Sequence, residues 1–180
     1  MRGKAVRAVA LGVFLLASRA AFAADEAKDA AANFYRSYAR LRAGGLTGIP
    51  DGPRLAQLAP LLTPELHDLF SVALLEQKRC EDKFPDDKPP WIEGDIFSSS
   101  FEGFTSFRAA ASRPAKQGRR VTVNFIYTEG KDRVKWTDTL LLRNEGGRWL
   151  VDDVFYRAHF PFGSGFGSNL RSSLKSIPAC

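Results

Sequence analysis

The sequence is poor in the side chains from which metal and nucleophile sites are usually built. Its 180 residues include two cysteines, two histidines and one methionine. His67 and His159 each stand alone, without a second histidine or a cysteine at the spacing of a zinc site. Ser164 is flanked directly by glycines and lacks the intervening residues of a nucleophile elbow. The sequence therefore predicts no metal site, no covalent nucleophile and no cofactor.

Long apolar runs are also missing. The longest, 8–17, has half the length that a membrane-spanning helix needs, which is about 20 residues. Three basic residues precede this run, and 21–23 has the small-x-small pattern of a cleavage site. This pattern predicts a cleaved signal peptide over 1–23 and one mature domain over 24–180. Because neither cysteine lies near the cleavage point, we expect no lipid attachment and a periplasmic or secreted protein without a membrane anchor.

A strong charge of either sign is absent once the signal is removed. The whole chain has 26 basic and 20 acidic residues, but four of the basic ones lie in the signal, which leaves a net charge of +2. The high isoelectric point of the precursor is therefore poor support for nucleic-acid binding. Four basic residues remain close together, and the turn-like stretch that holds them predicts a solvated hairpin loop: Arg113, Lys116, Arg119 and Arg120.

The predicted export decides how the two cysteines, Cys80 and Cys180, are interpreted. Two thiols in an oxidising compartment more often pair than stay free, so an internal disulfide is the favoured prediction. It would join the last residue to the middle of the chain. The alternative is a buried free Cys80, with Cys180 on a mobile tail where it pairs between molecules.

Helical patterns occupy the first half of the mature chain. Apolar residues at three- and four-residue spacing predict a helix over 25–42, and the cap-like Thr63-Pro64-Glu65 predicts a second one that ends before Pro85. Shorter helical turns are expected over 55–59 and 168–176.

After residue 103 the hydrophobic period changes to two, which indicates strands. Short turn-forming stretches separate four of them, predicted over 104–111, 121–128, 134–143 and 149–158. Helices followed by an antiparallel meander predict an α+β domain in which a curved four-stranded sheet packs one face on the helices.

Two acids of the last predicted strands, Asp138 and Asp153, form the most specific chemical pattern. If 144–147 makes the turn, the two carboxyls face each other across the strand pair. If the turn is 146–147, Asp138 faces Phe155 and the acids are diagonal on the same face. Either acid could then be a general base of raised pKa, or both could be structural and bond nearby donors. The candidate lining of an apolar ligand pocket beside them is Trp136, Trp149, Phe125 and Tyr127.

The segment 89–103 is dense in acids, hydroxyls and glycines, which predicts an ordered loop that satisfies its own backbone. Glu93, Asp95 and Glu102 are conceivable calcium ligands, but their spacing matches no EF-hand loop. We therefore do not predict a calcium site here.

Several motifs together resemble an uncharacterised family of secreted bacterial proteins. They are Pro-Pro-Trp-Ile-Glu-Gly-Asp-Ile-Phe-Ser-Ser (89–99), Phe-Glu-Gly (101–103), Trp-Thr-Asp (136–138) and Gly-Arg-Trp-Leu-Val-Asp-Asp-Val (147–154). The resemblance covers most of the mature chain and implies an NTF2-like, or cystatin-like, cone with N-terminal helices packed in a bent sheet. It transfers no established catalytic residue to any position here.

Two functions remain open because such domains include both enzymes and non-catalytic modules. The first is an exported binding or accessory domain of the bacterial envelope, which holds a small ligand or docks a protein partner. The second is a small enzyme of the isomerase or dehydratase type that uses Asp138 or Asp153 as its base. Dimerisation through the outer face of the sheet is common in such folds, so a homodimer is among the partners implied.

Overall fold

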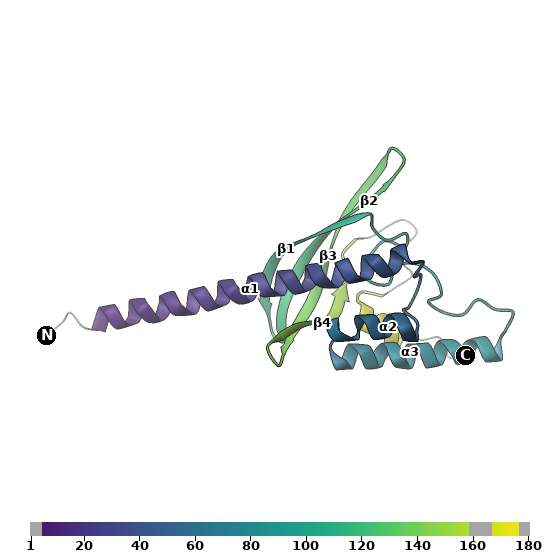
Figure 1. Cartoon of the computed structure of the whole chain (residues 1–180), viewed down its shortest axis with the longest axis horizontal. Helices are drawn as coiled ribbons and strands as arrows, with labels where there is room; N and C mark the ends of the chain where they lie inside the picture. The colour runs from purple at the N-terminus through teal and green to yellow at the C-terminus, as the bar shows by residue number, and fades with distance from the viewer. Residues whose placement is uncertain (1–4, 159–166, 177–180) are drawn as a thin grey trace.

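The computed structural model describes residues 5–158 and 167–176 (Figure 1). A long helix α1 (Ala5–Ala43) is followed by the short helix α2 (Gly52–Leu58), a 3-10 turn at Ala59–Leu61 and the helix α3 (Pro64–Lys83). The strands β1 (Ser106–Ala115), β2 (Gly118–Glu129), β3 (Asp132–Glu145) and β4 (Arg148–Phe155) come next, and α4 (Leu170–Lys175) is the last helix described. The helices therefore precede the sheet almost entirely.

The sheet is an antiparallel meander in the order β1-β2-β3-β4, and it is not closed. This confirms the predicted α+β class and the four-stranded antiparallel sheet. Each predicted strand has an observed counterpart, with ends that differ by a few residues. Short connections make this topology local, because sequential strands joined by two-residue turns can only pair as antiparallel neighbours.

Helix α1 crosses one face of the sheet, while its N-terminal half extends beyond the strands (Figure 1). Its buried stripe begins at Ala27 and continues at Ala31, Phe34, Tyr35 and Tyr38. These positions follow helical periodicity, so they form one continuous face against the strands. The part that packs on the sheet coincides with the helix predicted over 25–42, and the helical backbone continues upstream of it to Ala5.

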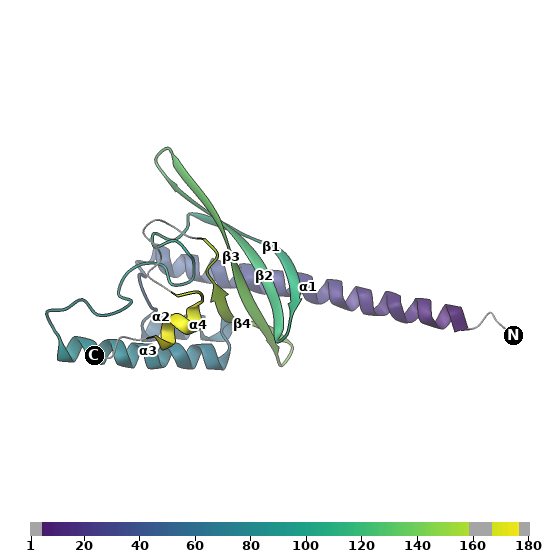
Figure 2. The ribbon, with the colours of Figure 1, turned by 180° about the vertical axis from the view of Figure 1, so that it is seen from behind.

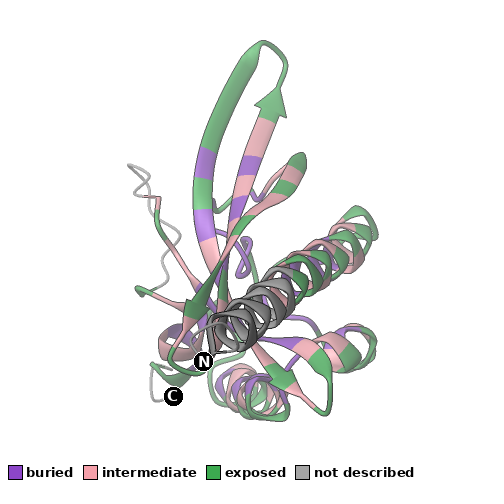
Figure 3. Ribbon diagram, turned by 90° about the vertical axis from the view of Figure 1, so that its left-hand side faces the viewer, coloured by how far each residue is buried: buried purple, intermediate pink, exposed green. Residues whose placement is uncertain are grey.

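Helix α3 begins where the sequence predicts, whereas α2 begins at Gly52, ahead of the turn expected over 55–59, and α4 begins at Leu170, within the stretch expected over 168–176. Thr63 caps α3, since its hydroxyl accepts the Leu66 N–H at 3.3 Å, and the helix ends at Lys83 before the proline. Asp51 caps α2 in the same way, and Asn169 caps α4. Side chains of α1, α3 and the sheet share one hydrophobic core, which Figure 3 shows as the buried middle of the molecule beside an exposed β2–β3 hairpin tip.

The predicted basic loop is partly wrong. Ser106–Ala115 and Gly118–Glu129 continue almost to the turn, so Arg113, Arg119 and Arg120 belong to strands and only Lys116 lies in the turn. Gly118 permits this tight reversal, because its φ is +126° and a Cβ there would lie 2.0 Å from the carbonyl oxygen of Leu142. The hairpin itself is confirmed.

Over the described ranges, no helix is both long enough and apolar enough to cross a membrane. The predicted cleavage of 1–23 stays a prediction.

Candidate functional site

A buried loop lies at the centre of the molecule. All residues of 94–100 are buried although none belongs to a helix or strand. Buried backbone polar groups need partners, and here side chains from other elements supply several of them. The Tyr35 hydroxyl donates to the carbonyl oxygen of Phe97 at 2.8 Å, and the Tyr156 hydroxyl donates to that of Ile96 at 2.6 Å. The loop is therefore fixed by α1 and the end of the sheet, and not only by its own hydrogen bonds as predicted.

Asp95 anchors one end of this loop and is fully buried. Its Oδ1 accepts the Tyr38 hydroxyl at 2.7 Å and the Phe97 N–H at 2.8 Å. Its Oδ2 lies 3.0 Å from a guanidinium nitrogen of Arg42, in an ion pair whose N–H is not aligned for a hydrogen bond. Burial raises the pKa of the Asp95 carboxyl, and Arg42 and the Tyr38 hydroxyl oppose that rise. Tyr38 and Arg42 lie one helical turn apart on α1 and thus both contact Asp95.

Arg42 reaches this position because Gly103 leaves space for it. Gly103 has a φ of +77°, and a Cβ at that position would lie 2.5 Å from the guanidinium carbon of Arg42. The same guanidinium donates to the carbonyl oxygen of Glu102 at 2.8 Å. The sequence interpretation missed this anchor and placed Asp95 among conceivable calcium ligands.

The three conceivable calcium ligands, Glu93, Asp95 and Glu102, make separate contacts. Glu93 is exposed and paired with Lys88, and Glu102 is exposed. No group of three potential ligands that could hold a metal ion occurs among the described residues.

Asp138 anchors the other end of the loop, and each of its two carboxylate oxygens accepts two hydrogen bonds. Oδ2 accepts the Ser99 N–H at 2.8 Å and the indole N–H of Trp136 at 3.1 Å. Oδ1 accepts the Ser99 hydroxyl and the Arg157 N–H, the latter at 2.9 Å. Burial raises the pKa of this carboxyl, and these donors oppose the rise. The structural interpretation of Asp138 thus has direct support, because every strong acceptor direction is in use.

The predicted juxtaposition of Asp138 and Asp153 is wrong. Gly146 and Gly147, both at positive φ, make the β3–β4 turn, so the direct opposition is lost. A bulge at Asp152 then shifts the register by one more residue, and Asp153 comes to pair with Leu141. One extra residue turns the following side chains to the other face. The two acids therefore lie on opposite faces, and the shared face expected for either turn does not exist.

Asp153 instead meets the last helix. Its Oδ1 accepts the N–H of Arg171, the second residue of α4, at 3.0 Å and its neighbour's N–H, that of Val154, at 2.9 Å. Beside it, Asp152 accepts the Thr63 hydroxyl at 3.0 Å and a guanidinium N–H of Arg171 at 2.6 Å. These adjacent acids tie β4 to the starts of α3 and α4. Burial raises the pKa of Asp153 to about 6.

This raised pKa predicts that stability increases as the solution becomes mildly acidic. The unfolded carboxyl has a pKa near 3.8, so between about pH 4 and 6 the folded state binds more protons and is stabilised as pH falls. From pH 7.5 to pH 5, Asp153 should add about 1 kcal/mol to the free energy of unfolding. Burial shifts Asp95 and Asp138 in the same direction. Urea unfolding at both pH values measures the change, and Asp153→Asn should reduce it; an unchanged pH slope in that variant would contradict the assignment.

The four apolar ligand candidates do not gather around one cavity. Phe125 and Trp136 stack with their ring centroids 5.3 Å apart, and Phe125 also packs on Tyr35 of α1. The Tyr127 hydroxyl donates to Glu129 toward the exposed end of the hairpin. Trp149 lies at the opposite end of the sheet, and its buried indole N–H has no hydrogen-bond partner among the described residues.

Cys80 is buried on α3, on the face that the sequence predicted. Cys180 lies outside the described residues, as do His159 and Ser164, so the disulfide stays a prediction. If the bridge forms, Cys180→Ser should lower the free energy of unfolding of the oxidised protein by about 2–4 kcal/mol, because a loop of about 100 residues is no longer closed. Mass spectrometry before and after reduction detects the bridge. A wild-type mass that reduction leaves unchanged would argue against it.

A separate, accessible feature is a groove of about 590 Å³ across β1, β2 and β3. None of the residues that line it is acidic; they are Ser106, Phe107, Arg108, Asn124, Phe125, Ile126, Lys135, Trp136 and Thr137. Alternation along the strands turns the rings of Phe107, Phe125 and Trp136 toward α1. Polar and charged side chains of the flanking rows therefore point to the outer face, which Figure 2 shows from the side opposite α1.

The fold and these two features define an α+β domain with a buried, acid-anchored loop on one side of its sheet and an open, non-acidic groove on the other. No protein-family model and no curated protein matches the chain. The site must therefore be interpreted from its own chemistry.

Proposed function

We propose that this protein is an exported, non-catalytic binding or accessory domain that holds a small ligand on the outer face of its sheet. The observation that carries the proposal is the groove across β1–β3. Its volume of about 590 Å³ lies in the range of small-molecule sites, roughly 300–1,000 Å³, and polar side chains of three strands converge on it. Export and an NTF2-like cone, implied by the signal-like start and by the family resemblance, belong to the same proposal.

The hydrogen bonds and positions of Asp138 and Asp153 support binding over catalysis. A general base needs a lone pair that can reach a substrate proton. Asp138 has both oxygens occupied by four donors, and Asp153 lies on the other face beneath α4. Neither acid lines the groove. Their raised pKa values follow from burial, which structural carboxyls share with catalytic ones.

Native mass spectrometry of the protein recovered from exporting cells tests the proposal. Wild type should retain a small molecule, and Thr137→Trp should lose it, because an indole at this exposed position of β3 fills the groove. Ala56→Trp is the matched control, since Ala56 is exposed on α2. A wild-type protein that retains no ligand, and whose groove amide signals do not change with small-molecule extracts of the same compartment, would contradict the function. A protein partner that binds wild type and not Thr137→Trp would replace the ligand by a partner.

A further inference from the structure

The outer face of β1–β3 collects positive charge. Five exposed cations lie on it: Arg108, Arg113, Arg120, Arg133 and Lys135. Their positions alternate with the buried residues of the same strands, which places them on the face away from α1. None of them forms an ion pair with a carboxylate in the part of the chain that the structure describes. A mature domain of net charge +2 thus has a markedly basic face.

Two of these cations stand at the groove. Arg108 is in register with Asn124 and Thr137, and Lys135 is in register with Ile126 and Ser106. They are two strands and two residues apart, which corresponds to roughly 12 Å between their Cα atoms. Long side chains at that spacing can approach a ligand from both sides.

Between them lies a neutral, hydrogen-bonding floor. The Thr137 hydroxyl donates to the amide oxygen of Asn124 at 3.0 Å, which orients the amide. The amide nitrogen of Asn124 has no partner among the described residues and remains a donor, and the Ser106 hydroxyl lies in the adjacent row. Donors and cations without a nearby acid are the complement of carboxylate and phosphate groups.

We propose that the groove binds a small organic anion, with Arg108 and Lys135 on its carboxylate or phosphate groups and Asn124 donating a hydrogen bond between them. This inference rests on the proposed binding function and adds the chemical class of the ligand. A second copy of the chain is a poorer occupant, because a two-fold interface sets the same patch against itself and would oppose like charges. The guanidinium groups of Arg120 and Arg157 both lie over the ring of Phe155, at 4.9 and 5.6 Å from its centroid. Arg120, which is farther from the groove, thus already has an interaction within the domain.

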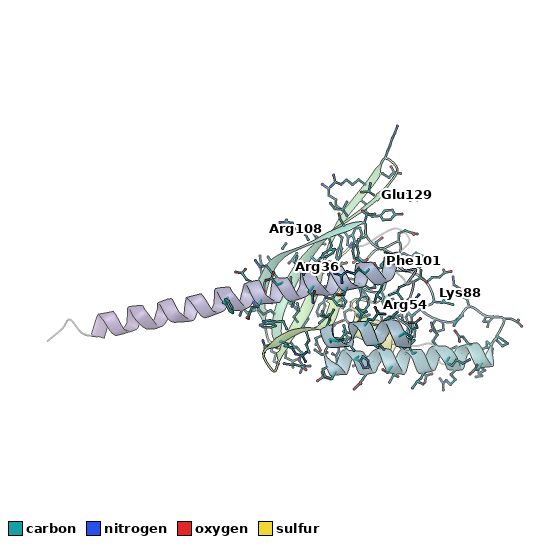
Figure 4. The ribbon with its side chains drawn as sticks, viewed as in Figure 1. Arg36, Arg54, Lys88, Phe101, Arg108 and Glu129 are labelled. Atoms are coloured by element: carbon teal, nitrogen blue, oxygen red, sulfur yellow. The ribbon has the colours of Figure 1, made fainter. Side chains whose placement is uncertain are left out.

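Amide NMR titration of the mature protein at low salt tests this, with citrate as the carboxylate probe, pyrophosphate as the phosphate probe and glycerol as the neutral control. Citrate or pyrophosphate should shift signals of 106–108, 124–126 and 135–137, and glycerol should not. Arg108→Gln with Lys135→Gln should weaken binding at least tenfold. Lys88→Gln removes one charge from the loop after α3, far from Arg108 (Figure 4), and should change it less than twofold.

The response to the two probes distinguishes the anionic group, since a site for only one of them would bind that one alone. The proposal is overturned if neither anion shifts the groove signals, if the double variant binds as wild type does, or if light scattering shows a wild-type dimer that Thr137→Trp does not form. A neutral ligand retained in native mass spectrometry and lost in Thr137→Trp would overturn the anionic class while leaving the proposed function intact.

Discussion

Replacing Asp95 by alanine is expected to lower the free energy of unfolding by about 3–5 kcal/mol, which is the cost of breaking a buried charge pair by removing one partner. The change leaves the Tyr38 hydroxyl and the Phe97 N–H without their acceptor and Arg42 without its counterion. Urea unfolding followed by tyrosine and tryptophan fluorescence measures it.

Two further variants make this prediction specific. Asp95→Asn keeps an oxygen for Tyr38 but not the charge that Arg42 faces, so its loss should be intermediate. Asp82→Ala removes an exposed acid on α3 that pairs with Lys78, and it should change stability by less than about 1 kcal/mol. If Asp95→Ala were no less stable than Asp82→Ala, the buried loop would not depend on its anchor.

Replacing Asp138 by alanine is expected to have the second large effect, again about 3–5 kcal/mol, because it leaves a buried set of donors unsatisfied. These are the N–H and hydroxyl of Ser99, the indole N–H of Trp136 and the Arg157 N–H. Hydrogen exchange should show the loss locally, with faster exchange at the Ser99 and Arg157 amides.

Asp138→Asn separates a structural acid from a catalytic one. Asparagine has the same shape, so a variant that lacked only a base would keep its stability. Here both carboxylate oxygens accept two bonds, so the amide NH2 group must face donors and the variant should lose about 1–3 kcal/mol. Full stability in Asp138→Asn would contradict the structural role and favour the enzyme interpretation. Asp68→Asn, an exposed change on α3, is the matched control.

The positions of helices and strands could be predicted well because they depend on local signals. Helical spacing of apolar residues, the Thr63-Pro64 cap and the alternation after residue 103 each reflect which face of a segment is buried. The same signals support the α+β class, since helices followed by closely spaced strands have few ways to share one core.

The candidate site was harder to predict from the sequence, because it depends on contacts between residues that are far apart along the chain. Pairing Asp138 with Asp153 required the turn and the bulge to be known, and the extra residue at Asp152 leaves no clear signal in a run of apolar and acidic residues. Asp95 meets Tyr38 and Arg42 across more than fifty residues of sequence. The only available hint was the four-residue spacing of Tyr38 and Arg42 on a predicted helix.

The chain composition and its periodicity are enough to define the secondary structure, the fold class and the expectation of export, because each of these reflects residues close together in sequence. The packed sheet alone decides which carboxyls are occupied and which cations stay exposed. Three strands bring Arg108, Asn124 and Lys135 to one face, while the bulge in β4 places Asp153 on the face opposite Asp138. The register between strands decides which side chains lie next to each other on a face, and a shift of one residue moves a side chain to the opposite face.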